Sequence, residues 1–353
     1  MSSEFRPQPQ SEPRAPRYRA VSIGHAPVEV TEEHGVLHMR SLEPLAELPA
    51  RLLDRLVHWA RVRPEQTFIA ARQADGDWRR VSYAQMLESV RAIAQALLSY
   101  GLSADKPLAL LSGNDIEHLQ VALGAMYAGI PYCPVSPAYS LLSQDFAKLR
   151  HVCDLLQPGL VFVSDAAAYQ RAIDAVLPAE TPLISVRGHV PGRAQVSFAS
   201  LLQTPGGSAA DQAFNATGPD SIAKFLFTSG STKLPKAVIT TQRMLCANQQ
   251  MLLQTFPVFG EEPPVLVDWL PWNHTFGGSH NVGIVLYNGG TFYLDAGKPT
   301  AQGFAETLRN LKEVSPTAYL TVPKGWEELV SALEQDAELR ECFFARMKLF
   351  FFA

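Results

Sequence analysis

A hydroxyl-rich stretch that follows an apolar run is the part of this sequence best suited to chemistry. The apolar run ends at Phe227, and after it come Thr228, Ser229, Gly230, Ser231 and Thr232, with Lys236 shortly beyond. Backbone N–H groups and hydroxyls donate hydrogen bonds to phosphate oxygens, glycine allows close approach of the backbone, and lysine adds positive charge. Residues 222–227 are expected to form a buried strand, and open α/β sheets bind ligands at the carboxyl ends of such strands. We therefore predict that residues 228–232 and Lys236 bind a polyphosphate.

This stretch has two other structural interpretations. A Walker-type loop needs a glycine before its lysine and opens directly into a helix, whereas this chain has Pro235 at that position and a β-branched run over residues 237–240. A Ser/Thr-rich hairpin turn between two strands fits the residues as well and remains open. A dinucleotide-binding dehydrogenase is disfavoured because no G-x-G-x-x-G follows a strand.

A second group of candidate residues surrounds His274. Residues 268–274 lead a predicted strand into a loop, and Phe276, Gly277 and Gly278 follow, so that backbone or substrate can come close. An imidazole here is able to orient one oxygen of a carboxylate, or to hold the loop by donating to a backbone carbonyl. A histidine with a purely structural role is the alternative. His280 does not stand at metal-ligand spacing from His274, and we expect it to line a pocket.

Aromatic side chains near His274 are candidates for the flat apolar walls of a binding pocket. Trp269, Trp272 and Phe276 are the nearest, although aromatic residues also serve as core. Trp272 follows the turn at Pro271, whereas Trp269 is expected within a strand, and this favours Trp272. The predicted pocket residues are Trp272, His274, Phe276, Gly277 and His280.

From Arg51 onward, helical and strand patterns alternate, which predicts an α/β fold with a largely parallel sheet. Asp75-Gly76 is predicted to join two strands in a hairpin, and Ser82 with Gln85 to form the capping box of a helix that reaches about residue 100. A second capping box, Asn114 with Glu117, is predicted before a helix ended by Gly129.

Further along the chain the same reasoning predicts the remaining elements and three regions. Strands are expected at 108–111, 160–163, 182–186, 265–269, 291–294 and 347–352, the last one buried, and helices at 169–177, 198–202, 242–255 and 279–286. Residues 204–217 are expected to be a surface connection. The predicted regions are a disordered or loosely attached extension (1–40), a first α/β subdomain (41–210) and a second one with the phosphate loop, incomplete at its C-terminus (211–353).

Composition limits the classes of function. The 353 residues, 47% hydrophobic and 18% charged, are ordinary for a globular protein of about two domains, and a net charge of -4 gives no basic surface for nucleic acid or anionic membranes. No signal sequence and no apolar run long enough to span a bilayer is visible. The four cysteines form no C-x-x-C, which disfavours a zinc site or a disulfide framework and fits a reducing cytoplasm. We therefore expect a cytoplasmic protein whose partners are small molecules.

Four stretches, in the same order along the chain, resemble the acyl-adenylate-forming enzymes. Thr-Ser-Gly-Ser-Thr-x-x-Pro-Lys looks like the phosphate-loop signature of that family, and residues 111–115, 127–137 and 270–278 are similar to three further family motifs. Residues 270–278 and 286–291 look most like feruloyl-CoA synthases. The resemblance extends from about residue 45 to the C-terminus. Lys233 and Ala237 stand where the family commonly has glycine, but neither change removes a phosphate donor.

The resemblance implies a fold, a reaction and cofactors. The fold would be the stacked α/β subdomains, with largely parallel sheets, of the large N-terminal domain of these enzymes, here truncated. The reaction would be activation of an aromatic, hydroxycinnamate-like carboxylate such as ferulate to acyl-AMP and then to the acyl-CoA thioester, with ATP, Mg²⁺ and coenzyme A. His274 and Lys236 would be the catalytic residues. The groups for adenine, ribose and metal, and a catalytic lysine, would lie beyond Ala353, so the chain alone is expected to be inactive; the alternative is a non-catalytic nucleotide-binding or acyl-binding remnant.

Overall fold

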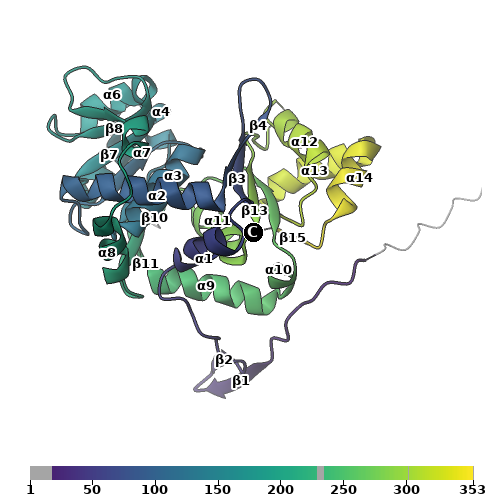
Figure 1. Ribbon diagram of the computed structural model, residues 1–353. Helices are drawn as coiled ribbons and strands as arrows, with labels where there is room; N and C mark the ends of the chain where they lie inside the picture. Colours follow the sequence, from purple (N-terminus) through teal and green to yellow (C-terminus); the bar gives the residue numbers. More distant parts are fainter. Residues whose placement is uncertain (1–17, 229–233, 301, 353) are drawn as a thin grey trace, which may run out of the picture.

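The computed structural model describes residues 18–228, 234–300 and 302–352, and it has an α/β fold with largely parallel sheets, as predicted. Figure 1 shows the chain as one group of strands and helices that holds β5 to β11, a central group around β3 and β13, and a helical group formed by α12 to α14. Two larger sheets run through the first two groups. The strands of these two sheets position the candidate site.

The larger sheet has seven strands in the order β11-β10-β6-β5-β7-β8-β9. Neighbouring strands are parallel except for β10 and β11, which are antiparallel. The strands are β5 (Leu108–Leu111), β6 (Tyr132–Pro134), β7 (Leu160–Asp165), β8 (Leu183–Arg187), β9 (Gln195–Ser197), β10 (Ile222–Thr228) and β11 (Lys236–Thr241). Because parallel strands are covered on both faces, β5 and the first four residues of β7 are continuous apolar runs.

Both faces of this sheet are covered by helices. Leu108 and Leu110 of β5 belong to the core formed with α2 (Tyr83–Leu97) and α3 (Ile116–Tyr127). Ala109 and Leu111, which alternate with them, belong to a separate core with α5 (Ala147–Leu156) and α6 (Ala166–Val176). The period of two along a strand therefore divides one strand between two cores.

The second sheet has four strands in the order β12-β13-β3-β4, namely β12 (Val265–Asp268), β13 (Thr291–Leu294), β3 (Thr67–Arg72) and β4 (Trp78–Ser82). A parallel pair, β14 (Ala318–Thr321) and β15 (Leu349–Phe352), lies beside β12, and the Thr317 amide donates to the Val265 carbonyl at 3.0 Å. Each of the two larger sheets combines segments from both sides of residue 210, so the predicted subdomain boundary there is not a boundary between these sheets.

The remaining helices are short or lie in the second half of the chain. They are α1 (Asp54–Val62), α4 (Ala138–Leu141), α7 (Phe198–Leu202), α8 (Ser208–Ala216), α9 (Gln242–Thr255), α10 (Val258–Glu261), α11 (Val282–Asn288), α12 (Phe304–Glu313), α13 (Pro323–Gln335) and α14 (Ala337–Ala345). A 3₁₀ turn, η1 (Leu98–Tyr100), follows α2, and a π-helical segment, η2 (Phe276–Asn281), precedes α11. Among the described residues no helix is both long enough and apolar enough to cross a membrane.

Several predicted local features are confirmed. Ser82 and Gln85 form the capping box of α2, and Gly101 ends the segment in the left-handed conformation. The hairpin between β3 and β4 turns at Gly76, whose φ of 91° is a conformation that favours glycine. Helix α9 has the predicted bounds.

Three local predictions are wrong. The cap of α3 is Asp115, which accepts from the His118 amide, and Asn114 is turned away to another segment. Within residues 204–217 the chain forms α8, because Ala210 and Phe214 share one helical face and are buried against the core. Strand β15 forms, but its side chains from Phe350 to Phe352 are exposed, since β14 is its only strand neighbour among the described residues.

The region predicted as a disordered or loosely attached extension includes a hairpin. Residues 1–17 lie outside the described part of the chain, and β1 (Val28–Glu33) pairs with β2 (Val36–Ser41) in an antiparallel ladder. Every residue of both strands is exposed, and Figure 1 shows the hairpin projecting from the body of the protein. The hairpin is regular structure within the region for which disorder or loose attachment was predicted.

Candidate functional site

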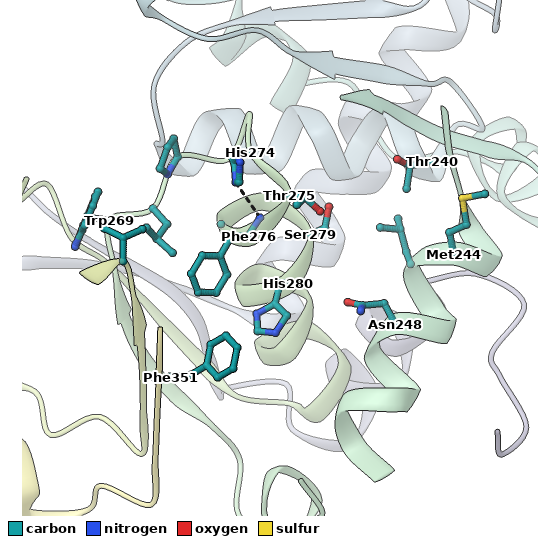
Figure 2. Close-up of a pocket in the computed structure, with 15 residues that line it drawn as sticks. Thr240, Met244, Asn248, Trp269, His274, Thr275, Phe276, Ser279, His280 and Phe351 are labelled. Atoms are coloured by element: carbon teal, nitrogen blue, oxygen red, sulfur yellow. Dashed lines mark hydrogen bonds between the residues drawn. The ribbon is translucent and has the colours of Figure 1, made fainter. Parts of the chain in front are cut away.

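A cavity of about 840 Å³ opens between β11, helix α9 and the segment that follows β12. We call it the wide cavity (Figure 2). Its lining residues are Thr240, Met244, Leu245, Asn248, Trp269, Leu270, Pro271, His274, Thr275, Phe276, Gly277, Ser279, His280, Val322 and Phe351. Four of the five residues predicted to form the pocket are among them, which leaves Trp272 as the exception.

Helix α9 supplies one wall of the wide cavity. Met244 and Asn248 are one helical turn apart and both line the cavity, and the Asn248 side chain points toward His280 (Figure 2). Helix α9 itself was predicted, but its contribution to the site was not. The buried face of α9 carries polar as well as apolar side chains, whereas a helix that only packs in a core keeps this face apolar. This pattern in the sequence could have indicated that α9 contributes to a site.

His274 stands at the entrance to η2, where the π-helical turn begins. Its carbonyl accepts from the Gly278 amide at 2.9 Å, and its Nδ1 accepts from the Phe276 amide at 3.4 Å. With Nδ1 acting as acceptor, a neutral imidazole carries its proton on Nε2 and can donate from there. The ring is exposed and lines the wide cavity, so it is accessible to a ligand.

His280 forms part of an aromatic wall in the same cavity. Its ring lies 6.3 Å from Phe351 in a stacked arrangement and 5.4 Å from Phe276 at an edge. Its Nδ1 lies 2.8 Å from Asn281 Oδ1, and Asn281 in turn donates to the Asp268 carboxylate, so Nδ1 of His280 is the donor. Burial lowers the pKa of His280, which keeps the imidazole neutral.

The two tryptophans of this segment have exchanged their predicted roles. Trp269 lines the wide cavity, whereas Trp272 is only 3% exposed and packs edge-on against His118 and Phe292 at 5.4 and 6.0 Å. The prediction that Trp272 forms the pocket wall before Trp269 is therefore corrected. Strand β12 ends at Asp268, one residue earlier than predicted, so Trp269 belongs to the loop and the turn carries Trp272 inward.

Gly277 and Gly278 allow the backbone to fold closely on itself. A Cβ at Gly277 would meet the Leu270 and Pro271 carbonyls, and one at Gly278 would overlap the Trp272 carbonyl. The predicted close approach at these glycines is therefore made by the main chain of residues 270–272. This close packing brings the loop after β12 and the η2 segment into one wall of the cavity.

A buried network holds this loop in place. Asn114 donates from Nδ2 to the Leu270 carbonyl at 2.8 Å and accepts from the Trp272 amide at 3.0 Å. Asp268, also buried, accepts from the Leu270 amide at 3.0 Å and from Asn281 Nδ2 at 2.9 Å, and burial raises its pKa to about 7. Asn114 therefore connects the end of β5 to the site, a role that the sequence reading missed when it assigned this residue to a helix cap.

The predicted phosphate loop connects two antiparallel strands. Thr228 ends β10, Lys236 begins β11, and the two are paired in the ladder. Ser229, Gly230, Ser231 and Thr232 lie outside the described residues. Thr228 and Lys236 are exposed, and the Pro235 carbonyl lies 2.9 Å from His151 Nε2 of α5. The two strands that flank the loop therefore form a hairpin. Because a strand follows the loop, as predicted, the helix of a Walker-type loop is excluded.

Lys236 and Thr240 lie on the same face of β11 because they are separated by an even number of residues. Their separation along the strand is about 13 Å at the usual rise per residue. Thr240 lines the wide cavity, so β11 leads from the hydroxyl-rich loop to that cavity.

A buried lysine was missed altogether. Lys224 lies in the middle of β10, is 2% exposed, and donates from Nζ to the Gly278 carbonyl at 3.0 Å. Burial lowers its pKa to about 7. The sequence pattern that could have indicated it is a single charged residue inside an otherwise apolar strand.

No group of three or more His, Cys, Asp or Glu side chains in the described parts of the chain is placed to hold a metal ion.

The sequence is similar to acid–CoA ligases. A long-chain-fatty-acid–CoA ligase of Xenopus laevis is 24% identical over 299 residues, which are 81% of this chain and 39% of that protein. A 3-[(3aS,4S,7aS)-7a-methyl-1,5-dioxo-octahydro-1H-inden-4-yl]propanoyl:CoA ligase of Rhodococcus jostii (strain RHA1) is 26% identical over 253 residues, 70% of this chain and 48% of that protein. The chain thus spans less than half the length of these relatives.

Solved structures share the fold. A fatty acid AMP ligase from Legionella pneumophila has a TM-score of 0.60 at 18% identity and covers 77% of this chain, which in turn covers 44% of it. The adenylation domain of a keto acid-selecting peptide synthetase module has a TM-score of 0.64 at 18% identity, with coverages of 83% and 50%. The α/β arrangement is thus that of the N-terminal domain of adenylate-forming enzymes. A sequence profile of the AMP-binding enzymes matches residues 56–349, and the chain belongs to this family.

Proposed function

We propose that this chain is part of an enzyme that activates an aromatic carboxylate with ATP and transfers the acyl group to coenzyme A. The observation that carries the proposal is that one cavity joins the predicted carboxylate-binding histidine, His274, to a strand that begins at the predicted phosphate-binding lysine, Lys236. Its family relatives include acid–CoA ligases. In the proposed reaction the carboxylate attacks the α-phosphate of ATP, pyrophosphate leaves, and the thiol of coenzyme A then displaces AMP.

The chemical difficulty is that an anionic carboxylate must approach an anionic phosphate. Hydrogen-bond donors and positive charge aimed at the departing pyrophosphate lower this barrier by electrostatic stabilisation. In our proposal residues 228–232 and Lys236 provide these donors. His274 donates from Nε2 to one carboxylate oxygen and so orients the other toward phosphorus.

The walls of the wide cavity favour an aromatic acid such as ferulate. Trp269, Phe276 and Phe351 present flat apolar surfaces, and His280 adds a neutral ring. Because Gly277 has no side chain, its backbone packs directly against the main chain of Leu270 and Pro271 in this wall. Ligand pockets of this size and character bury most of a small substrate and use few polar groups to orient it.

The described residues offer no carboxylate cluster that fits Mg²⁺, so we derive no step through a metal held by this chain. Since the chain spans less than half the length of these relatives, we propose that the groups for adenine, ribose and coenzyme A lie outside the part of the protein described here. We therefore expect this chain alone to bind ATP weakly and to turn over negligibly. The alternative function is a non-catalytic module that binds a nucleotide or an acyl compound.

The experiment is exchange of labelled pyrophosphate into ATP that depends on an added aromatic acid, measured with the complete reading frame that contains this chain. Lys236→Ala is expected to slow the exchange by about tenfold or more, the range for losing a donor to a developing anion. Lys106→Ala, a change of another exposed lysine, serves as the control and leaves the rate unchanged. Equal rates in all three proteins would remove Lys236 from the mechanism, and ATP binding without exchange would support the non-catalytic alternative.

A further inference from the structure

The π-helical segment η2 carries both histidines of the wide cavity. His274 stands at its entrance and His280 lies within it, and both line the cavity (Figure 2). A π-helix is rare and is found mostly as a single turn, frequently at functional sites. Its carbonyl groups need hydrogen-bond partners wherever water has little access. The contacts that hold η2 in this form therefore also set where the two histidines lie.

Two buried side chains from other elements bind the carbonyl groups of η2. Lys224 of β10 is 2% exposed and donates from Nζ to the Gly278 carbonyl at 3.0 Å. Gln249 of α9 is 1% exposed, donates from Nε2 to the Ser279 carbonyl at 3.1 Å, and has the His280 carbonyl at 3.3 Å from the same atom. Three successive carbonyl groups of η2 are thus held from outside the helix.

The bond from Lys224 reaches His274 through a single residue. The Gly278 amide donates to the His274 carbonyl at 2.9 Å, while the Gly278 carbonyl accepts from Lys224. On its other side Gly278 packs so closely that a Cβ would overlap the Trp272 carbonyl. Lys224 therefore fixes the residue to which the backbone of His274 is bonded.

Strand β10 relates this contact to the predicted phosphate loop. Lys224 precedes Thr228 by four residues in β10, which is about 13 Å at the usual rise per residue, and Thr228 is the first residue of that loop. The bond between Lys224 and Gly278 thus joins the strand that leads to the predicted phosphate-binding residues to the segment that carries His274. These are the two sides of the proposed reaction.

A buried lysine is a costly way to make one hydrogen bond. Burial lowers the pKa of Lys224 to about 7, and no acidic side chain in the described parts of the chain contributes to that shift. An apolar residue at this position of the strand would avoid the cost of burying the amine. A small cavity of about 20 Å³ is lined by Lys224 and shares Leu245 and Ser279 with the wide cavity, so the lysine lies directly behind the site. Buried ionisable groups in such places are candidate functional residues.

We infer that Lys224, assisted by Gln249, is a positioning residue that holds η2 and thereby fixes His274 relative to the strand that leads to the phosphate loop. This inference rests on the proposed function and adds two residues that lie outside the predicted motifs. Lys224 acts through Gly278 and His274 and does not touch the substrate. Such a role has a large effect on rate, because a misplacement of about 1 Å at the reacting groups costs up to about 100-fold.

The test is a double-mutant cycle in acid-dependent pyrophosphate exchange, measured with the complete reading frame that contains this chain. Lys224→Met keeps the length of the side chain but removes the donor, and we expect it to lower the exchange rate at saturating substrates about tenfold while the KM for ATP changes less than about twofold. In the His274→Ala background the same change is expected to lower the rate less than about twofold, because its effect passes through His274. Lys148→Met, at the surface over the ring of Tyr139, leaves the rate and the KM unchanged.

Hydrogen exchange of backbone amides in the same proteins is a second readout that needs no activity. In Lys224→Met the Gly278 amide is expected to exchange about tenfold faster, whereas the Val161 amide, bonded to Pro182 in the far part of the seven-stranded sheet, keeps its rate. Thermal melting checks that each variant is folded. Should Lys224→Met fail to fold, Gln249→Leu removes the other donor to η2 and takes its place, with the same dependence on His274 expected.

Equal losses of rate in the presence and absence of His274 would overturn the inference, since they would mean that Lys224 supports the fold as a whole. An unchanged exchange rate, or unchanged protection of the Gly278 amide, would overturn it as well. Absence of acid-dependent exchange in the unmodified protein, with faster Gly278 amide exchange in Lys224→Met, would contradict the proposed function and support the part of the inference in which Lys224 holds η2.

Discussion

Trp269 and Trp272 are three residues apart, and their surroundings give them different roles. Trp269 lines the wide cavity, and Trp272 is buried against His118 and Phe292. Trp272→Ala is therefore expected to lower the free energy of unfolding by about 3–5 kcal/mol, as large-to-small changes in a core do. Trp269→Ala is expected to weaken binding of an aromatic acid while changing stability much less.

Denaturant unfolding and calorimetric binding of 4-hydroxycinnamate, measured on both variants, distinguish these roles. Each tryptophan serves as the control for the other, because the chemical change is the same. A larger loss of stability in Trp269→Ala than in Trp272→Ala would contradict the assignment. Which of the two tryptophans lines the wide cavity therefore depends on where β12 ends, and a difference of one residue changes the outcome.

At the scale of elements, Asn114 joins the loop after β5 to the loop after β12. Asn114→Ala removes a donor to the Leu270 carbonyl and an acceptor for the Trp272 amide. We expect the free energy of unfolding to fall by about 1–3 kcal/mol, because the carbonyl and the amide lose their partners where water has little access. The measurement is equilibrium unfolding in urea. Asn215→Ala, the same change at an exposed position of α8, is expected to have an effect within about 0.5 kcal/mol.

The same contact predicts a consequence for the site. Since Leu270 lines the wide cavity, Asn114→Ala is expected to weaken acid binding as well as stability. Similar stability for the Asn114 and Asn215 variants would show that the two loops are held together by other contacts. Elements of the two sheets meet at this point, so the site depends on strands that are distant in the sequence.

At the scale of the whole molecule, the buried charge of Lys224 connects stability to pH. Burial lowers its pKa from 10.5 to about 7 in the folded chain. Between these values the unfolded chain binds more protons than the folded one, so the free energy of unfolding contributed by this group rises with pH. From pH 8 to 10 we expect the wild type to gain up to about 1.4 kcal/mol per pH unit relative to Lys224→Met.

Urea unfolding of both proteins at several pH values measures this difference. Burial raises the pKa of the buried cysteines and tyrosines in the folded chain, so these groups also make stability depend on pH, but they are common to both proteins and cancel in the comparison. Asp268, whose pKa is raised to about 7, titrates below the window. Parallel stability curves for wild type and variant would mean that Lys224 keeps its charge when the chain folds.

Local sequence patterns predicted much of the fold. The capping box at Ser82, the turn at Gly76 and the bounds of α9 follow from interactions between neighbours in the chain, and the structure has them. The alternation of helices and strands predicted the parallel sheets, because parallel strands need a crossover between them. Four of the residues predicted for the pocket, among them His274 and His280, line the wide cavity, and their binding of a substrate stays a prediction.

What the sequence by itself determined was therefore local chemistry and the type of each long element. Only the tertiary structure decided which side chains share a cavity, because that depends on contacts between segments far apart in the chain. Asn114 was assigned to the helix next to it and instead binds Leu270, while Lys224 was one residue in an apolar run until packing placed it behind the wide cavity. Burial, which turns a common lysine into a group with a lowered pKa, exists only after the sheets and helices have assembled.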